Sequence, residues 1–317
     1  MNDLPHEATE SVRRVLAFLE QGGTPKIHEM TPAAARQLFE TLAPALDMPP
    51  PPVGRVEERM IPGGAGPVPV RIFWPEDPPD GPLPLVVFFH GGGFVIGSSR
   101  VYARVTGHLA NRAGAVVASI DYRLAPEHPF PAAVEDAVAA TRWAAAAATD
   151  LGADPARLIV AGDSAGGNLA AVTALHARDA GSPSLAGQVL IYPVTDMASV
   201  RPSFEAFGEG LFLERETMRW FAEAYIPDAS LRTDWRVSPL CAPDHRALPP
   251  AYILTAGLDP LRDEGEAYAE KLRQAGVAVT HRRWEGLIHG FLNMGGVVPE
   301  ARAALAEIAD WIRGLGA

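Results

Sequence analysis

The chain has 317 residues, of which 48% are hydrophobic and 21% charged, a composition that excludes wholesale disorder and suffices for one large α/β domain with an insertion. The formal net charge of −11 argues against nucleic acid or an anionic membrane as a partner, because both bind basic protein faces. Cys241 is the only cysteine, which excludes an intrachain disulfide, and since neither a secretory signal nor a run of about 18 apolar residues is visible, we expect a cytoplasmic protein without a membrane-spanning helix.

Two amphipathic helices are predicted near the N-terminus. Apolar side chains recur at helical spacing in residues 10–20, with Thr9 as the N-cap and two glycines as the stop, and a second helix begins after Thr31. The four prolines at 49–52 cannot join the interior of a sheet. We therefore expect residues 1–50 to form a helical segment apart from the main domain, either packed against it or lying over a pocket.

Strands and helices alternate along most of the remaining chain. The first two strands, 55–61 and 68–74, are expected to form an antiparallel pair, and the strand 83–89 is apolar on both faces, as in the centre of a sheet. Further strands are expected at residues 115–121, 158–161, 188–192, 251–256 and 277–284, and helices at 102–112, 132–148 and 300–315. This alternation is typical of a mostly parallel sheet covered by helices.

A glycine-rich loop, His90 followed by three glycines, stands directly after the strand 83–89. The backbone N–H groups of Gly91 and Gly92 can approach a substrate carbonyl oxygen closely, because no side chain blocks them. These residues are therefore predicted to form part of an oxyanion hole. His90 is expected to brace the loop rather than to transfer protons.

The most informative motif is a serine between glycines, at the point where an apolar strand gives way to a helix. Gly162, Ser164 and Gly166 fit the G-x-S-x-G elbow, which holds a serine hydroxyl above the sheet in a strained backbone conformation. The N–H of Ala165 would begin the helix and point toward the developing oxyanion. Ser164 is thus the predicted nucleophile, and the alternative is a glycine-rich turn with an incidental serine.

Residues 196–235 interrupt the alternation of strands and helices. They are rich in aromatic side chains and show no strand-like pattern, so we interpret them as a helical insertion. Two interpretations stay open, namely that the rings line an apolar pocket for an acyl group or that they only pack the insertion onto the core.

A serine nucleophile needs a base, and His289 is the best candidate among nine histidines. It stands late in the chain, in a loop with glycines that follows a strand. His281 lies within a strand and His245 lies in a proline-bounded loop, so both fit less well.

The acid that orients this histidine should lie between the serine and the histidine in the chain. Asp259 directly follows the strand 251–256, at a strand end where loops carry function in open α/β sheets. Asp263 is the main rival, although it could instead cap the next helix. We favour Asp259.

Five motifs in this order resemble the hormone-sensitive-lipase-like family of bacterial carboxylesterases (bacterial family IV), in its GDSAG branch. They are HGGGF at 90–94, DYRLAPEHPFPAAVED at 121–136, GDSAGG at 162–167, DPLRDEG at 259–265 and HGF at 289–291.

The resemblance implies an α/β-hydrolase fold with a mostly parallel eight-stranded sheet, flanking helices and a helical cap. The cap would comprise residues 1–50 and 196–235, and the core residues 51–195 and 236–317. No metal or cofactor is implied, and the reaction is hydrolysis of short to medium acyl esters. By position, the triad would be Ser164, Asp259 and His289, and the oxyanion hole Gly91, Gly92 and Ala165.

Two alternatives to an esterase, and one question of assembly, remain at this stage. The same triad serves amidases, lactonases and peptidases, and hormone receptors similar to this family bind a ligand without catalysis. Such receptors typically lose the catalytic histidine, whereas His289 is present here.

Alternating residues at 277–281 suggest an edge strand through which two copies could pair as a homodimer.

Overall fold

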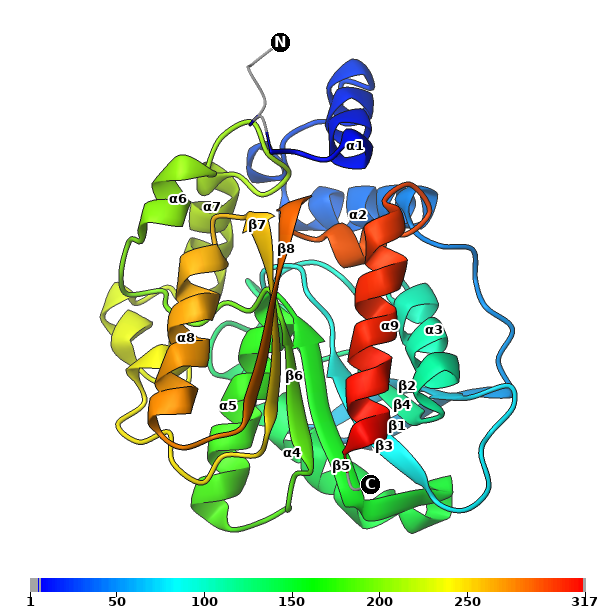
Figure 1. Cartoon of the computed structure of the whole chain (residues 1–317). Helices are drawn as coiled ribbons and strands as arrows, with labels where there is room; N and C mark the ends of the chain where they lie inside the picture. The colour runs from blue at the N-terminus through cyan, green and yellow to red at the C-terminus, as the bar shows by residue number, and fades with distance from the viewer. Residues whose placement is uncertain (1–4, 6, 316–317) are drawn as a thin grey trace.

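The computed structural model describes residue 5 and residues 7–315 and contains an eight-stranded sheet in the order β1-β2-β4-β3-β5-β6-β7-β8 (Figure 1). The strands are β1 (Arg55–Pro62), β2 (Pro67–Trp74), β3 (Leu83–Phe89), β4 (Val116–Ile120), β5 (Ala153–Asp163), β6 (Gly187–Ile191), β7 (Ala251–Leu258) and β8 (Val279–Ile288). β2 is antiparallel to β1 and to β4, and the six strands from β3 to β8 are parallel. The predicted mostly parallel eight-stranded sheet is therefore confirmed, as is the antiparallel pair.

Helices cover both faces of the sheet (Figure 1). α3 (Ala103–Ala113) and α9 (Pro299–Gly314) pack on one face. α4 (Ala132–Ala147), α5 (Ala165–Ala180) and α8 (Arg262–Gln274) pack on the other. Short 3-10 helices occur at η1 (Ile27–Glu29), η2 (Thr149–Leu151), η3 (Ala229–Thr233), η4 (Pro239–Cys241) and η5 (Phe291–Met294).

The central strand β3 shows why a continuous apolar run belongs in this position. Leu85, Val87 and Phe89 contribute to the core beneath α4 and α5, whereas Val86 and Phe88 contribute to the core beneath α3 and α9. All seven residues of β3 are buried. Because successive side chains of a strand point to opposite faces, a strand covered on both faces must be apolar throughout.

Four further helices lie at the carboxyl ends of the parallel strands (Figure 1). They are α1 (Glu10–Gln21), α2 (Pro32–Leu46), α6 (Pro202–Ala206) and α7 (Arg215–Tyr225). Thr9 and Thr31 cap α1 and α2, each accepting a backbone N–H at 3.3 Å. The N-terminal segment and the insertion, far apart in the sequence, thus meet over the same edge of the sheet.

Two strands are longer than the sequence indicates. β5 begins at Ala153, which pairs with Leu83 of β3; the register then shifts across residues 154–157, and pairing with β3 resumes at Leu158. β8 continues past Trp284 to Ile288 and ends directly before His289. The extension of β8 matters for function, because it carries the histidine to the edge where Ser164 stands.

Candidate active site

Ser164 occupies a strained turn between β5 and α5. Its φ of 55° and ψ of −117° are rare for a residue with a side chain. The turn is fixed by the N–H of Ser164, which donates to the carbonyl of Ile191 at 2.8 Å. β-carbons on Gly162 and Gly166 would overlap backbone atoms of the elbow and of β3, so only glycine fits at either position.

A chain of two hydrogen bonds connects Ser164 to a buried carboxylate. Nε2 of His289 lies 2.9 Å from Oγ of Ser164, and Nδ1 lies 2.7 Å from Oδ2 of Asp259. Ser164 is 8% exposed, His289 7% and Asp259 0%. The remaining oxygen of Asp259 accepts the N–H of Leu261 at 2.8 Å, which fixes the carboxylate. The hydroxyl, the imidazole and the carboxylate therefore have the geometry of an activated nucleophile.

The rival residues have other partners. Asp263 accepts the N–H of Ser203 at 2.8 Å and pairs with Arg262, so it ties α6 to α8. His281 contacts the hydroxyl of Thr255 on β7 at 3.0 Å. His245 is buried, with Nε2 2.9 Å from the carbonyl of Pro239.

The sequence analysis missed Tyr192, whose ring lies against the imidazole. The ring centroids of Tyr192 and His289 are 4.8 Å apart, and the tyrosine has a φ of 34°. Tyr192 also packs edge-on against Phe291. No sequence signal marks Tyr192, because its strained position directly after β6 becomes evident only when β6 and β8 are placed in one sheet.

The prediction that Gly91 donates to an oxyanion is wrong. Its N–H donates to Oδ1 of Asp163 at 2.7 Å, and a backbone amide has a single proton. Within residues 7–315, no protein acceptor takes the N–H of Gly92, Gly93 or Ala165. Gly92 and Gly93 line the same cavity as Ser164, whereas Gly91 does not. The available donors are thus one residue further along the loop than predicted.

The carbonyls of the loop determine where these N–H groups point, because C=O and N–H are opposed across a trans peptide. The carbonyl of Gly91 accepts from Nδ1 of His90 at 2.7 Å, which turns the N–H of Gly92 away from His90. The carbonyl of Gly92 accepts the N–H groups of Val95 and Ile96 at 3.0 and 2.9 Å, which turns the N–H of Gly93 away from this turn.

His90 has the bracing contacts that the sequence analysis expected. Its ring stacks on Tyr122 with centroids 4.4 Å apart, and the Tyr122 hydroxyl donates to the carbonyl of His90 at 2.7 Å. Burial lowers the pKa of His90, which favours a neutral ring that can keep its proton on Nδ1.

Asp163, next to the nucleophile, is a buried carboxyl at the cavity wall. Besides the N–H of Gly91 it accepts the hydroxyl of Tyr102 at 2.9 Å. Burial raises its pKa to about 6, against the opposing effects of the Tyr102 hydrogen bond and of His289. The side chain therefore connects the serine elbow to the glycine loop.

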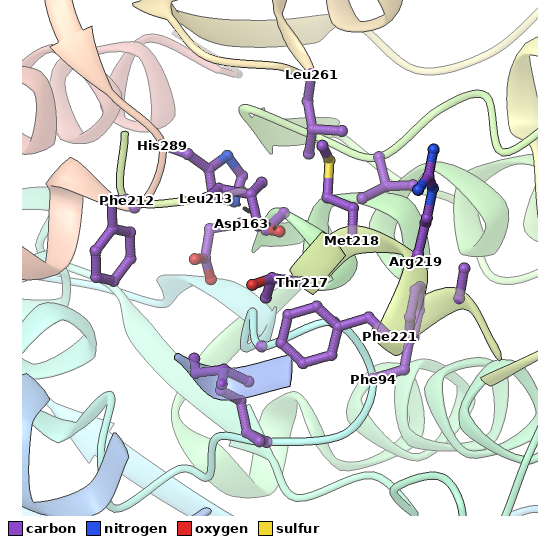
Figure 2. Close-up of a pocket in the computed structure, with 18 of the residues that line it drawn as sticks. Phe94, Asp163, Phe212, Leu213, Thr217, Met218, Arg219, Phe221, Leu261 and His289 are labelled. Atoms are coloured by element: carbon purple, nitrogen blue, oxygen red, sulfur yellow. Dashed lines mark hydrogen bonds between the residues drawn. The ribbon is translucent and has the colours of Figure 1, made fainter. Parts of the chain in front are cut away.

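A cavity of about 360 Å³ lies over Ser164, between the sheet edge and the helices α2, α6 and α7. Phe204, Phe212 and Phe221 line it, and Figure 2 shows Phe212 and Phe221 flanking Asp163 and His289. Phe207 and Tyr225 instead pack into the core. Some rings of the insertion thus line the cavity, and others pack onto the core; that the cavity takes an acyl group stays a prediction.

Other candidate chemistry is sparse in the part of the chain that the structure describes. Residues 7–315 contain no cluster of three or more His, Cys, Asp or Glu side chains that could hold a metal ion. Burial raises the pKa of the Cys241 thiol, which disfavours the reactive thiolate. None of the described helices is both long and apolar enough to cross a bilayer.

Comparison with known proteins agrees with this geometry. Residues 86–293 match a family described as alpha/beta hydrolase fold. The chain is 45% identical to Esterase LipI of Mycobacterium tuberculosis over 252 residues, which are 79% of each protein. It is 44% identical to Carboxylesterase NlhH of the same organism over 254 residues, again 79% of each.

A solved structure of similar shape is that of an alpha/beta hydrolase enzyme from the metagenome of Lake Arreo, Spain. It superposes with a TM-score of 0.94 and 41% sequence identity, covering 98% of each chain. The similarity therefore includes the N-terminal segment and the insertion, not only the sheet.

Proposed function

The chain belongs to the alpha/beta hydrolase fold family, in its hormone-sensitive-lipase-like branch, and is a carboxylic ester hydrolase; from this premise we propose that Ser164, His289 and Asp259 form its catalytic triad. The observation that carries the proposal is the pair of contacts at 2.9 and 2.7 Å that joins the three side chains. They also follow one another in the chain order serine, acid, histidine that this fold uses.

The proposed reaction is acyl transfer in two steps. Oγ of Ser164 attacks the ester carbonyl while Nε2 of His289 takes its proton, and the imidazolium then protonates the departing alkoxide. Water attacks the resulting acyl-enzyme with His289 again as the base, which releases the acid and restores Ser164. Asp259 holds the proton of the imidazole on Nδ1 and stabilises the imidazolium.

We propose that the N–H groups of Gly92, Gly93 and Ala165 form the oxyanion hole. All three line or adjoin the cavity at Ser164, and no protein atom in the described chain accepts from them. Ala165 adds the positive end of α5, a helix of 16 residues.

The helices in residues 1–50 and 196–235 are proposed to form a cap over this site. Support comes from the cavity itself, which is lined by Phe39 and Leu42 of α2 and by Met218 and Phe221 of α7. Apolar walls around a small volume favour acyl groups of short to medium length. Activity across a graded series of p-nitrophenyl acyl esters measures this preference.

Substitution Ser164→Ala tests the nucleophile. We expect the hydrolysis of p-nitrophenyl butyrate to fall by at least about 10⁴-fold, because attack and acyl-enzyme formation both need the hydroxyl. Ser184→Ala, at an exposed position in the loop between α5 and β6, is the matched control. A Ser164→Ala protein with the parent rate would refute the proposal.

Two further experiments separate the esterase from its alternatives. Matched ester and amide substrates with one acyl group distinguish esterase from amidase or peptidase activity, and lactones are assayed beside them. Labelling by a fluorophosphonate, located at Ser164 by mass spectrometry, distinguishes an active hydrolase from a receptor that only binds its ligand.

Homodimer formation through β8 is also proposed. β8 stands at the end of the strand order and pairs with β7 alone, which leaves one row of backbone groups for a second copy. A monomer mass by light scattering at working concentration would count against it. A cytoplasmic location stays a prediction, and cell fractionation tests it.

A further inference from the structure

We propose that Arg36 of α2 and Phe221 of α7 are positioning residues that hold the loop of residues 92–96 so that the N–H of Gly93 faces the reacting carbonyl. The inference rests on the proposed triad and oxyanion hole. It assigns to the two cap segments a role in transition-state stabilisation that is separate from forming a pocket.

We call Arg36, Phe221 and their contacts with the loop the clamp. Its first arm is the guanidinium of Arg36. Its Nε donates to the carbonyl of Val95 at 2.8 Å, and its Nη2 donates to the carbonyl of Ala125 at 2.8 Å. The Glu127 carboxylate accepts hydrogen bonds from Nη1 at 2.9 Å and from Nη2 at 2.6 Å, which fixes the plane of the guanidinium. A rigid fork of donors is suited to hold two carbonyls at once, and a lysine cannot reproduce it.

The same two backbone segments are already joined to each other. The N–H of Ala125 donates to the carbonyl of Phe94 at 2.9 Å. Arg36 thus closes a small network in which the carbonyls of Phe94 and Val95 are both held. Because Val95 also donates its N–H to the carbonyl of Gly92, a displacement of Val95 would reach the peptide that precedes Gly93.

The second arm is one face of α7. Phe221 and Tyr225 are four residues apart, so both point toward the loop. The Phe221 ring lies so close to Gly93 that a β-carbon on Gly93 would overlap it. The Tyr225 ring stacks on Phe94, with centroids 3.8 Å apart and planes 5° from parallel.

Further contacts anchor the helix end that carries these rings. The carbonyl of Tyr225 accepts the N–H of Phe130 at 2.9 Å, and the two rings meet edge to face. α7 is therefore fixed to the core beside the loop rather than free to swing above it.

The loop backbone between the two arms is intrinsically flexible and depends on outside contacts to keep one conformation. Gly93 has a φ of 60°, and glycine adopts many other conformations at little cost. If the clamp is loosened, the peptide between Gly92 and Gly93 can rotate and turn its N–H away from the oxyanion. Loss of a single oxyanion donor costs on the order of 100-fold or more in turnover.

The test compares kcat and KM of Arg36→Lys and Phe221→Leu with those of the parent. We expect kcat to fall by about 10- to 100-fold with KM within about threefold. The reason is that the hydrogen bond from the Gly93 N–H to the oxyanion stabilises the transition state rather than the bound substrate. Binding of a trifluoromethyl ketone, which mimics the tetrahedral intermediate, should weaken by the same factor as kcat/KM.

Two control variants keep the interpretation specific. Arg14→Lys, in an exposed pair with Glu10, and Phe207→Leu, at the C-cap of α6 and outside the cavity lining, should retain the parent kcat. Thermal unfolding of every variant identifies any loss that reflects folding.

The outcomes separate the inference from the function it rests on. A change in KM alone, or unchanged kcat and ketone binding in folded Arg36→Lys and Phe221→Leu, overturns the clamp but leaves the triad intact. Retained activity in Ser164→Ala instead refutes the triad, and with it the premise of the clamp.

Discussion

Glu264 offers a quantitative test of the electrostatics around this site. It lies in α8 and is 7% exposed, and its Oε1 accepts the N–H groups of Thr195 and Asp196 at 2.7 and 3.2 Å. Burial raises the pKa of Glu264 from 4.5 to about 8; the two N–H groups oppose this rise, and the carboxylates of Asp196 and Asp259 add to it. The carboxyl is therefore protonated in the folded protein at neutral pH.

Whether the free energy of unfolding rises or falls with pH depends on which state, folded or unfolded, binds more protons. Between pH 4.5 and about pH 8 the unfolded chain has released this proton while the folded protein keeps it, so the free energy of unfolding falls as the pH rises. Each pH unit in that window is equivalent to about 1.4 kcal/mol, and the loss between pH 5 and pH 8 is about 3 to 4 kcal/mol for Glu264 alone.

Glu264→Gln removes this titration and keeps an oxygen that can accept both N–H groups. We expect the difference in free energy of unfolding, variant minus parent, to rise by about 3 to 4 kcal/mol between pH 5 and pH 8. Taking the difference cancels Asp163 and Asp47, whose pKa values burial raises to about 6 and about 7.

Urea unfolding followed by tryptophan fluorescence at pH 5, 6.5 and 8 measures this difference. Glu270→Gln is the matched control, because Glu270 lies on the same helix and is exposed. Its difference from the parent should stay within about 0.5 kcal/mol at every pH. If the curves of Glu264→Gln and the parent run parallel across the range, the reasoning about the buried carboxyl is refuted.

Three other substitutions test the site directly. Asp259→Asn should keep the fold but reduce kcat on the order of 10⁴-fold, because the amide favours the wrong tautomer of His289; steady-state kinetics and circular dichroism check both parts. Tyr102→Phe leaves one oxygen of the buried Asp163 carboxyl without its 2.9 Å partner and should cost about 1 to 3 kcal/mol of stability, measured by urea unfolding. Gly166→Ala should abolish soluble expression or activity, because its β-carbon would overlap the backbone of β3; a soluble variant with the parent kcat would contradict the close approach of elbow and strand.

Local patterns in the sequence were sufficient wherever the physics is local. β3 is apolar on both faces, Thr9 and Thr31 cap their helices, and the glycines around Ser164 leave no room for side chains. The caps depend on neighbours within a few residues and β3 on burial of a whole strand, whereas the glycines form a recognisable local motif although part of the space they leave is bounded by β3. Such patterns predict the order of strands and helices and the position of the elbow without knowledge of any long-range contact.

The sequence also identified His289 and Asp259 as candidates, but it could not exclude Asp263. Both carboxyls follow β7 within a few residues, and only the packing of α6 shows that Asp263 is engaged with Ser203. Tyr192, beside the imidazole, carries no sequence signal at all.

The glycine loop shows the limit most clearly. Three consecutive glycines are equivalent as a pattern, and the sequence alone favoured the first two as donors. Tertiary structure decided otherwise. Asp163, 72 residues away in the chain, accepts the hydrogen bond of the Gly91 N–H, whereas the N–H groups of Gly92 and Gly93 have no acceptor among the described residues. A backbone amide donates only once, so the sequence determined that this loop could hold an oxyanion, whereas the long-range partner of each amide determined which residues are free to do so.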